Sequence, residues 1–241
     1  TTEIYTLSLH DALPIFIGII GMVILLVIAF ALSNNKKAIN YKTVGVGLAL
    51  QIIFGIFIFK VPVGQKIFLW LGEVIVKLLE FANVGGKFVY GPLLDDKQMG
   101  TVFGCSIPFA FQLISATVFM MMIVNILYYY GIMQRVVTVL GKAMNKLMKV
   151  SGAEALSNVA SAFVGQVTAQ IMIKPYLAKL TRSELLASMA GSMACTSGAM
   201  MPVYAMMGIP IVYVLASAIM AIPGALVMTK LVYPETGEPE T

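Results

Sequence analysis

Long uncharged runs, separated by short charged segments, dominate the hydrophobic pattern of this chain. Phe16–Leu32 and Thr43–Phe59 are apolar over seventeen residues each, apart from Gln51. At a rise of about 1.5 Å per residue, this is close to the length that crosses the hydrocarbon core of a bilayer. Gly100–Gln134 is uncharged over 35 residues and Leu185–Thr229 over 45, enough for one and two further spans. The pattern predicts an all-α integral membrane protein with several transmembrane helices.

Two other segments combine apolar and charged positions at helical spacing. In Gln65–Glu80 and Arg135–Lys149, apolar residues recur every three or four positions and charged residues take the opposite face. This periodicity predicts helices that lie in the membrane interface. A soluble helix that packs on a partner is the alternative for Gln65–Glu80. The apolar face predicted for the second helix contains Val136, Leu140 and Leu147, and its basic face suits anionic headgroups.

Turn signals and charge complete this outline. Gly-Gly, Gly-Pro and Asp-Asp pairs predict turns over Asn83–Gly100. Only 11% of the residues are charged, against about 25% in a soluble domain. The net charge of +5 sits in short connecting segments, which is typical of basic loops that set topology and not of nucleic-acid binding. Ser33–Lys42 carries three lysines, so we expect this loop to be cytoplasmic and the protein to lie in the inner cell membrane.

One segment, Ala155–Ile173, is too polar for a span that faces lipid. At its centre, Gly165 and Gln166 join a helix-weakening glycine to a large amide. Non-helical backbone at membrane depth is tolerated only where protein buries it or where it lines a wet cavity. We therefore predict a re-entrant helical hairpin that offers helix ends and carbonyl groups to a solute and a cation. The polar residues of the segment are Ser157, Asn158, Ser161, Gln166, Thr168 and Gln170.

In the last long run a break is expected near Met207–Pro210, the segment Met193–Pro202 is weakened by small and hydroxyl residues, and the second span looks irregular because it carries Pro223–Gly224. Small and hydroxyl residues can also mediate close helix packing in membranes. Packing is the favoured interpretation of Ser157, Ser161 and Ser197. Solute binding is favoured for Gln166, because an amide in hydrocarbon needs several partners.

Enzyme chemistry is not indicated. The sequence has no phosphate-binding loop, no nucleophile–base pair and no metal-ligand spacing of Cys or His. None of the long uncharged runs holds a carboxylate, so no proton relay is visible. Thr1–Ile15, which includes the single histidine, His10, resembles translated sequencing-adapter sequence and is expected to be a non-native scar.

Four stretches resemble the concentrative nucleoside transporters. They are Leu127–Gln134, which resembles the family's LYYLGIMQ; Ser151–Ser157, which resembles SGAESL; Val164–Leu185, which parallels VGQTEAPLLVRPYL and MTRSEL without a gap; and Tyr233–Thr241, which resembles YPETEEPET. Because the motifs follow the family's order and spacing from about Phe16 onward, the chain is identified as a member of that family.

The resemblance implies an architecture. Family members have two inverted repeats, each with a re-entrant hairpin and a broken helix, held by scaffold helices in a homotrimer. Residues 16–150 are accordingly expected to form scaffold spans and interfacial helices, 151–233 the first transport repeat, and 234–241 an acidic loop. The second repeat would follow Thr241, so we expect the chain to be truncated.

The resemblance also implies site residues. Gln166, beside Gly165, matches a glutamine that hydrogen-bonds the nucleobase, whereas Val167 and Thr168 stand where the family has Thr or Ser and then Glu. Losing that glutamate removes a strong acceptor. Ser161 stands where many sodium-coupled members have Asn and some proton-coupled members have Ser, so the coupling ion stays open. The positions of the family's sodium site fall on Ser161, Val164, Cys195, Thr196 and Ala199.

The resulting hypothesis is a secondary active transporter that takes up nucleosides on an inward sodium or proton gradient. The replacements at Val167 and Thr168 leave two alternatives. One is a divergent paralogue that moves another solute, such as a purine base or a modified nucleoside. The other is a non-transporting membrane scaffold.

Overall fold

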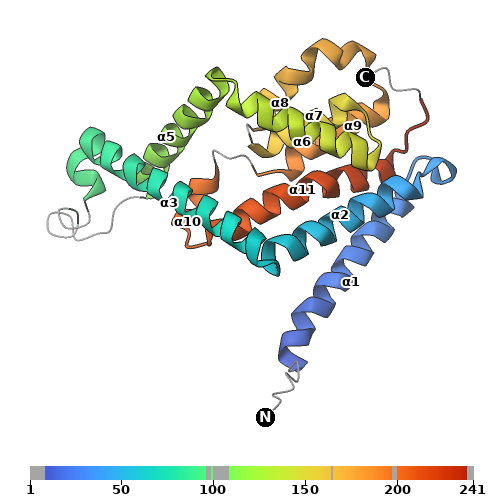
Figure 1. Ribbon diagram of the computed structural model, residues 1–241, viewed down its shortest axis with the longest axis horizontal. Helices are drawn as coiled ribbons and strands as arrows, with labels where there is room; N and C mark the ends of the chain where they lie inside the picture. The colour runs from blue at the N-terminus through green and yellow to red at the C-terminus, as the bar shows by residue number, and fades with distance from the viewer. Residues whose placement is uncertain (1–8, 96–98, 100–108, 164, 197–199, 238–241) are drawn as a thin grey trace.

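The computed structural model describes residues 9–95, 99, 109–163, 165–196 and 200–237, and these ranges contain helices and connecting segments but no strands (Figure 1). Three short 3-10 helices, at Lys36–Ala38, Gly91–Leu94 and Lys174–Lys179, join longer ones. The α-helices are α1 (Leu9–Ala31), α2 (Tyr41–Phe59), α3 (Pro62–Tyr90), α5 (Phe109–Tyr129), α6 (Ile132–Met148), α7 (Gly152–Phe163), α8 (Gln166–Ile173), α9 (Arg182–Ala194), α10 (Met201–Met206) and α11 (Ile211–Val232).

Three helices in the described ranges are long and apolar enough to cross a membrane: α2, α5 from Ala110, and α11. Helices of the predicted length and apolar character are therefore confirmed at Thr43–Phe59 and within Gly100–Gln134. The apolar part of α1, Ile17–Ala31, is shorter. The helix begins at Leu9, inside the stretch that we expect to be a scar.

The core is built around α11, which packs on α2 over most of its length (Figure 1). Gly47 makes the close approach possible, because a Cβ there would collide with Val227 of α11 and Met148 of α6. Small residues of this kind let helix backbones approach without a hydrophobic driving force. The buried cluster continues into α7 and α9 through alanines such as Ala155 and Ala187.

The irregularity expected at Pro223–Gly224 does not interrupt the helix, because α11 runs unbroken through Pro223. Proline lacks the amide hydrogen that continues a helix, so carbonyls in the preceding turn need other donors. The carbonyl that loses its donor to Pro223 is that of Ile219, four residues earlier, and Gln51 of α2 adds a hydrogen bond in the same turn, since its Nε2 donates to the neighbouring Met220 carbonyl oxygen at 3.2 Å. A side chain at Gly224 would occupy the space of the Gln51 amide. The amide and the glycine thus fit together beside the proline turn of α11.

The turn predicted at Asn83–Gly100 is wrong in its first part. Helix α3 passes through Gly85 and Gly86 and ends only at Tyr90, where Gly91 has a φ of 54° and Pro92 follows. A Cβ on Gly86 would lie 2.5 Å from the Ser115 Oγ of α5. The glycine pair therefore serves helix packing, whereas the Gly-Pro pair stops the helix.

Helix α6 confirms the amphipathic segment at Arg135–Lys149 but shows a different buried face. Val136, Leu140 and Leu147 are 38–50% exposed. The helix instead packs on the protein through Val137, Gly141, Met144 and Met148. One apolar face thus meets protein and a second one, beside the basic residues, remains on the surface.

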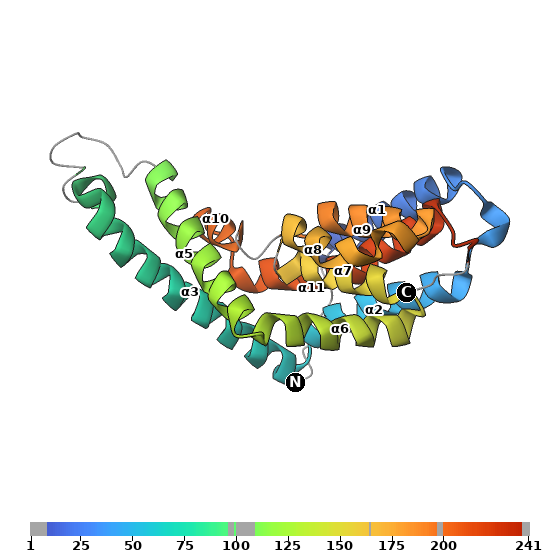
Figure 2. The same cartoon turned by 90° about the horizontal axis from the view of Figure 1, so that it is seen from above.

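The polar segment folds as two helices, α7 and α8, that pack against each other and against α9. The segment predicted to be weakened, Met193–Pro202, is not one continuous helix, because α9 ends at Ala194 and α10 begins at Met201. A further break at Met207–Pro210 separates α10 from α11, as predicted. In both views α7, α8 and α9 gather on one side of the molecule, and α3 and α5 lie on the other (Figures 1 and 2).

Candidate functional site

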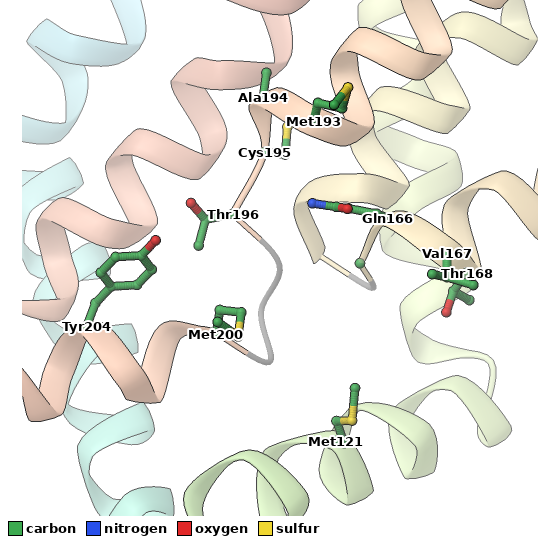
Figure 3. Close-up of a pocket in the computed structure, with 11 residues that line it drawn as sticks. Met121, Gln166, Val167, Thr168, Met193, Ala194, Cys195, Thr196, Met200 and Tyr204 are labelled. Atoms are coloured by element: carbon green, nitrogen blue, oxygen red, sulfur yellow. The ribbon is translucent and has the colours of Figure 1, made fainter. Parts of the chain in front are cut away.

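A cavity of about 530 Å³ lies where the two broken segments meet. The hairpin contributes four consecutive residues to its wall, Gly165–Thr168, and the end of α9 contributes Met193–Thr196. The remaining wall comes from Met121 of α5 and from Met200 and Tyr204. In Figure 3 the Gln166 side chain extends toward the Cys195–Thr196 segment. The structure therefore brings six of the nine predicted site residues to one cavity.

Gly165 creates the opening between α7 and α8. Its φ of 104° and ψ of 163° are open to glycine and strained for other residues. The chain reverses there, and α8 begins at Gln166. The positive end of the α8 dipole and the exposed Gln166 amide thus face the same cavity. Together they can accept and donate hydrogen bonds to an uncharged polar solute.

Val167 and Thr168 also line the cavity. Val167 is 75% exposed and cannot hydrogen-bond through its side chain, and Thr168 is half-buried. The wall next to Gln166 therefore offers one hydroxyl where a carboxylate would have provided a charged acceptor.

Ser161 lies apart from the cavity wall, in a network that joins α7 to α9. The Ser157 and Ser188 Oγ atoms are 2.6 Å apart, and those of Ser161 and Ser192 are 3.2 Å apart. Gln170 of α8 completes the network, accepting from the Ser188 Oγ at 3.0 Å and bonding the Ser192 Oγ. The favoured interpretation of Ser157 and Ser161 as packing residues agrees with these contacts, while Ser197 lies outside the described residues.

The predicted sodium ligands are distributed differently. Cys195 and Thr196 line the cavity, beside the C-terminal end of α9. The Ser161 Oγ is fully buried and donates to the Ser157 carbonyl oxygen at 2.8 Å. Val164 and Ala199 lie outside the described residues. Helix C-termini and carbonyls can hold a sodium ion in transporters, and the described part of the chain has no cluster of His, Cys, Asp or Glu that would hold another metal.

The sequence indicated the remaining cavity residues and the serine network only in part. Met193 and Met200 lie in the weakened segment Met193–Pro202, but nothing marked them, Met121 or Tyr204 as cavity residues, because each is an ordinary residue of an apolar run. The serine pairs carried a usable signal, since Ser157 and Ser161 on α7 and Ser188 and Ser192 on α9 repeat an i, i+4 spacing that aligns side chains on one helix face.

Two carboxylates outside the long uncharged runs are buried in the folded chain. Glu154 and Glu184 are 1% and 0% exposed. Both stand near the starts of helices, outside the long uncharged runs, where charged side chains are usually solvated. Glu154 pairs with Lys230 of α11, a contact between distant positions that the sequence pattern does not reveal, and Glu184 is held in the capping box at the start of α9.

Comparisons with known proteins agree with this geometry. Residues 20–93 match a family described as "Na+ dependent nucleoside transporter N-terminus", and residues 110–211 match one described as "Nucleoside recognition". An uncharacterized transporter of Haemophilus influenzae is 40% identical over 220 residues, which are 91% of this chain and 51% of the relative. The rat sodium/nucleoside cotransporter 1 is 35% identical over 218 residues, which are 90% of this chain and 32% of that protein.

A solved structure extends the likeness to the fold. It is described as CNTnw in an inward-facing substrate-bound state, and it superimposes with a TM-score of 0.88 at 35% identity, covering 92% of this chain and 54% of that one. The chain spans about half the length of the bacterial relative and of this structure, and a third of the rat protein. Relatives of this kind are transporters and not enzymes. The chain belongs to the concentrative nucleoside transporter family and corresponds to the N-terminal half of its members.

Proposed function

We propose that the protein containing this chain is a secondary active transporter that takes up nucleosides on an inward sodium or proton gradient. The observation that carries the proposal is the cavity formed by Gly165–Thr168 and the end of α9. Its volume of about 530 Å³ falls in the range of small-molecule sites, about 300–1,000 Å³. Gln166 supplies a donor and an acceptor that suit the edge of a nucleobase.

Coupling to one cation would supply enough free energy for scavenging. A single charge moving down a potential of 100 mV contributes about 2.3 kcal/mol. This corresponds to roughly fortyfold accumulation, since about 1.4 kcal/mol changes an equilibrium tenfold. The name of the rat relative, sodium/nucleoside cotransporter 1, favours sodium as the coupling ion. Ser161 stands where some proton-coupled members also have Ser, so the proton is the second candidate.

The direct test is uptake by the complete protein in proteoliposomes. Labelled nucleoside should accumulate only with an inward sodium or proton gradient, and Gln166→Leu should lower the apparent affinity at least tenfold, because one to two hydrogen bonds to the base are lost. Gln134→Leu removes an amide outside the cavity and serves as the control. Uptake that persists after both gradients are collapsed would contradict the coupling.

The replacements at Val167 and Thr168 bear on which nucleoside is taken. They favour a solute that needs no charged acceptor at this wall, such as a purine base or a modified nucleoside. Restoring the family residues with Val167→Thr and Thr168→Glu should raise uridine affinity in the complete protein. If the double variant binds uridine no better than the parent does, base recognition follows another scheme here.

Location and assembly belong to the same proposal. The three basic residues of Ser33–Lys42 support a cytoplasmic loop and an inner-membrane protein. The family resemblance supports a homotrimer, and native mass spectrometry of the complete protein in detergent would test it.

A further inference from the structure

A buried group of charges joins the start of the hairpin to the end of α11. Lys230, in the last turn of α11, places its Nζ 2.8 Å from the Glu154 Oε1 of α7 and 3.3 Å from the Glu235 Oε2 beyond α11. The Ser183 Oγ of α9 lies 3.0 Å from the same Nζ. Three separate parts of the chain, α7, α9 and the end of α11, therefore meet at one ammonium group.

The two carboxylates of this group are not equally satisfied. Glu235 also accepts from the Thr181 Oγ1 at 2.9 Å and from the Gly237 amide at 3.1 Å. Glu154 is 1% exposed, and its Oε2 has no hydrogen-bond partner among the described residues. An ionised oxygen without a partner in the interior carries a large desolvation cost. Glu154 Oε2 is thus the atom at which one more bond would stabilise the group most.

The charges around Lys230 also favour an additional bond at Glu154 Oε2. Two carboxylates, Glu154 and Glu235, share the single ammonium of Lys230, at 2.8 and 3.3 Å. A third carboxylate, Glu184 of α9, faces the group but accepts from the Thr181 amide at 2.6 Å in a capping box. The exposed Lys149, at the end of α6, lines the rim of the adjoining cavity and remains within reach of solvent.

That cavity gives a small ligand access to Glu154. Its volume is about 220 Å³, and its wall includes Asn40, Ser151, Glu154, Lys230 and Glu235. A metal cation at Glu154 Oε2 would lie close to the Lys230 ammonium, which is held 2.8 Å from the other oxygen of the same carboxylate, and like charges so close repel strongly. A proton avoids this conflict because it removes the charge of Glu154 and leaves Lys230 paired with Glu235.

We propose that Glu154, together with Lys230 and Glu235, is a proton-binding site that links pH to the attachment of the hairpin. A hydronium ion from solvent gives up one proton, which forms the O–H bond at Glu154 Oε2 and leaves a neutral water, and the neutral acid replaces the ion pair on α7. Release returns the proton to the same water and restores the Glu154–Lys230 pair. Because α7 packs against α8, the state of Glu154 on α7 is communicated to the helix that begins at Gln166.

The electrostatics set the direction of the pH effect. Burial raises the pKa of the Glu154 carboxyl above its ordinary value, and the Lys230 ammonium opposes this in part. Glu154 belongs to α7, outside the three candidate spans. In the interval between the ordinary and the raised pKa, the folded protein keeps a proton that the unfolded chain has released. Stability therefore falls as the pH rises through that interval.

Thermal unfolding of the complete protein in detergent, followed across pH without nucleoside, tests the site. We expect the melting temperature of the parent to fall with rising pH in a one-proton step. Glu154→Gln should abolish that step, because the amide is always neutral. Glu80→Gln changes an exposed carboxylate of α3 and should leave the step in place. A Glu154→Gln curve that runs parallel to the parent curve would overturn the proposal.

A second variant decides the question if Glu154→Gln does not fold. Glu235→Gln leaves one carboxylate for one ammonium, so Glu154 should stay ionised to lower pH and the midpoint of the step should move down. An unchanged midpoint would count against the site. Both measurements omit nucleoside, so their outcome is separate from that of the transport proposal.

Discussion

Gln51 illustrates how a single polar residue can support an apolar span. Its amide donates to the Met220 carbonyl next to Pro223, and Gly224 leaves the space for it. In hydrocarbon, such an interhelical hydrogen bond is worth about 0.6–2 kcal/mol. The pairing gives the amide of α2 a partner in the turn that precedes Pro223.

Gln51→Leu should therefore lower the free energy of unfolding of the complete protein by about 1 kcal/mol, because the interhelical hydrogen bond to the Met220 carbonyl oxygen is lost. Thermal or denaturant unfolding in detergent measures the change. Ile52→Leu, at an exposed neighbouring position, is the control and should have almost no effect. Equal stability of Gln51→Leu and the parent would show that the helix does not need this bond.

Gly165 is the second residue whose replacement has a definite consequence. A side chain at its φ of 104° costs on the order of 1–3 kcal/mol. Gly165→Ala should destabilise the protein by about this amount and reduce nucleoside-induced thermal stabilisation, because the reversal before α8 is disturbed. Gly85→Ala, at an open helical position of α3, should be neutral or slightly stabilising. A fully active Gly165→Ala protein would contradict the role of the reversal.

At the scale of elements, hydrophobic pattern predicted the helical segments better than it predicted their faces and ends. The break at Gly165 and the division of the last long run at Met193–Pro202 followed from residue types that weaken a helix locally. The same reasoning misjudged Gly85–Gly86 and Pro223. Their effect depends on a partner, Ser115 in one case and Gln51 in the other, which lies far away in the sequence.

The adjacent glycines of α3 allow this dependence to be tested. Gly86→Ala should cost about 1–3 kcal/mol, since its Cβ would overlap the Ser115 side chain and overpacking has about that cost. The neighbouring Gly85→Ala substitution meets no atom within 4 Å and is the matched control. Equal melting temperatures of the two variants would mean that α3 and α5 adjust freely at their contact.

Helix α6 carries only basic charges, whereas α3 carries both signs. Lys142 and Lys146 are exposed beside the apolar residues Leu140 and Leu147, an arrangement that favours an anionic membrane surface. We predict that Lys142→Gln with Lys146→Gln reduces the thermal stabilisation of the complete protein by phosphatidylglycerol in mixed micelles, with a loss of about 1 kcal/mol per lysine. Lys77→Gln on α3 is the control. An undiminished lipid effect in the double variant would exclude α6 as the contact.

At the scale of the whole molecule, polar contacts and apolar contacts occupy different regions. The hairpin, α9 and the end of α11 are joined by serines, Gln170 and the Glu154–Lys230 pair. The other side, where α3, α5 and α10 lie, contacts the rest mainly through apolar side chains such as Phe68 and Met201. Sequence patterns could not foresee this division, because it arises from which helices become neighbours.

The serine–glutamine network of α7, α8 and α9 has a mechanical consequence. Hydrogen bonds are directional, so those that join α7 and α8 to α9 resist sliding of these helices against one another. A movement of the hairpin should therefore move α9 with it. The thioethers of Met121 and Met200 across the cavity are flexible and tolerate many arrangements. If the hairpin moves in the complete protein, we therefore expect α7, α8 and α9 to move together as a rigid body. The methionine side chains across the cavity would rearrange to accommodate that movement.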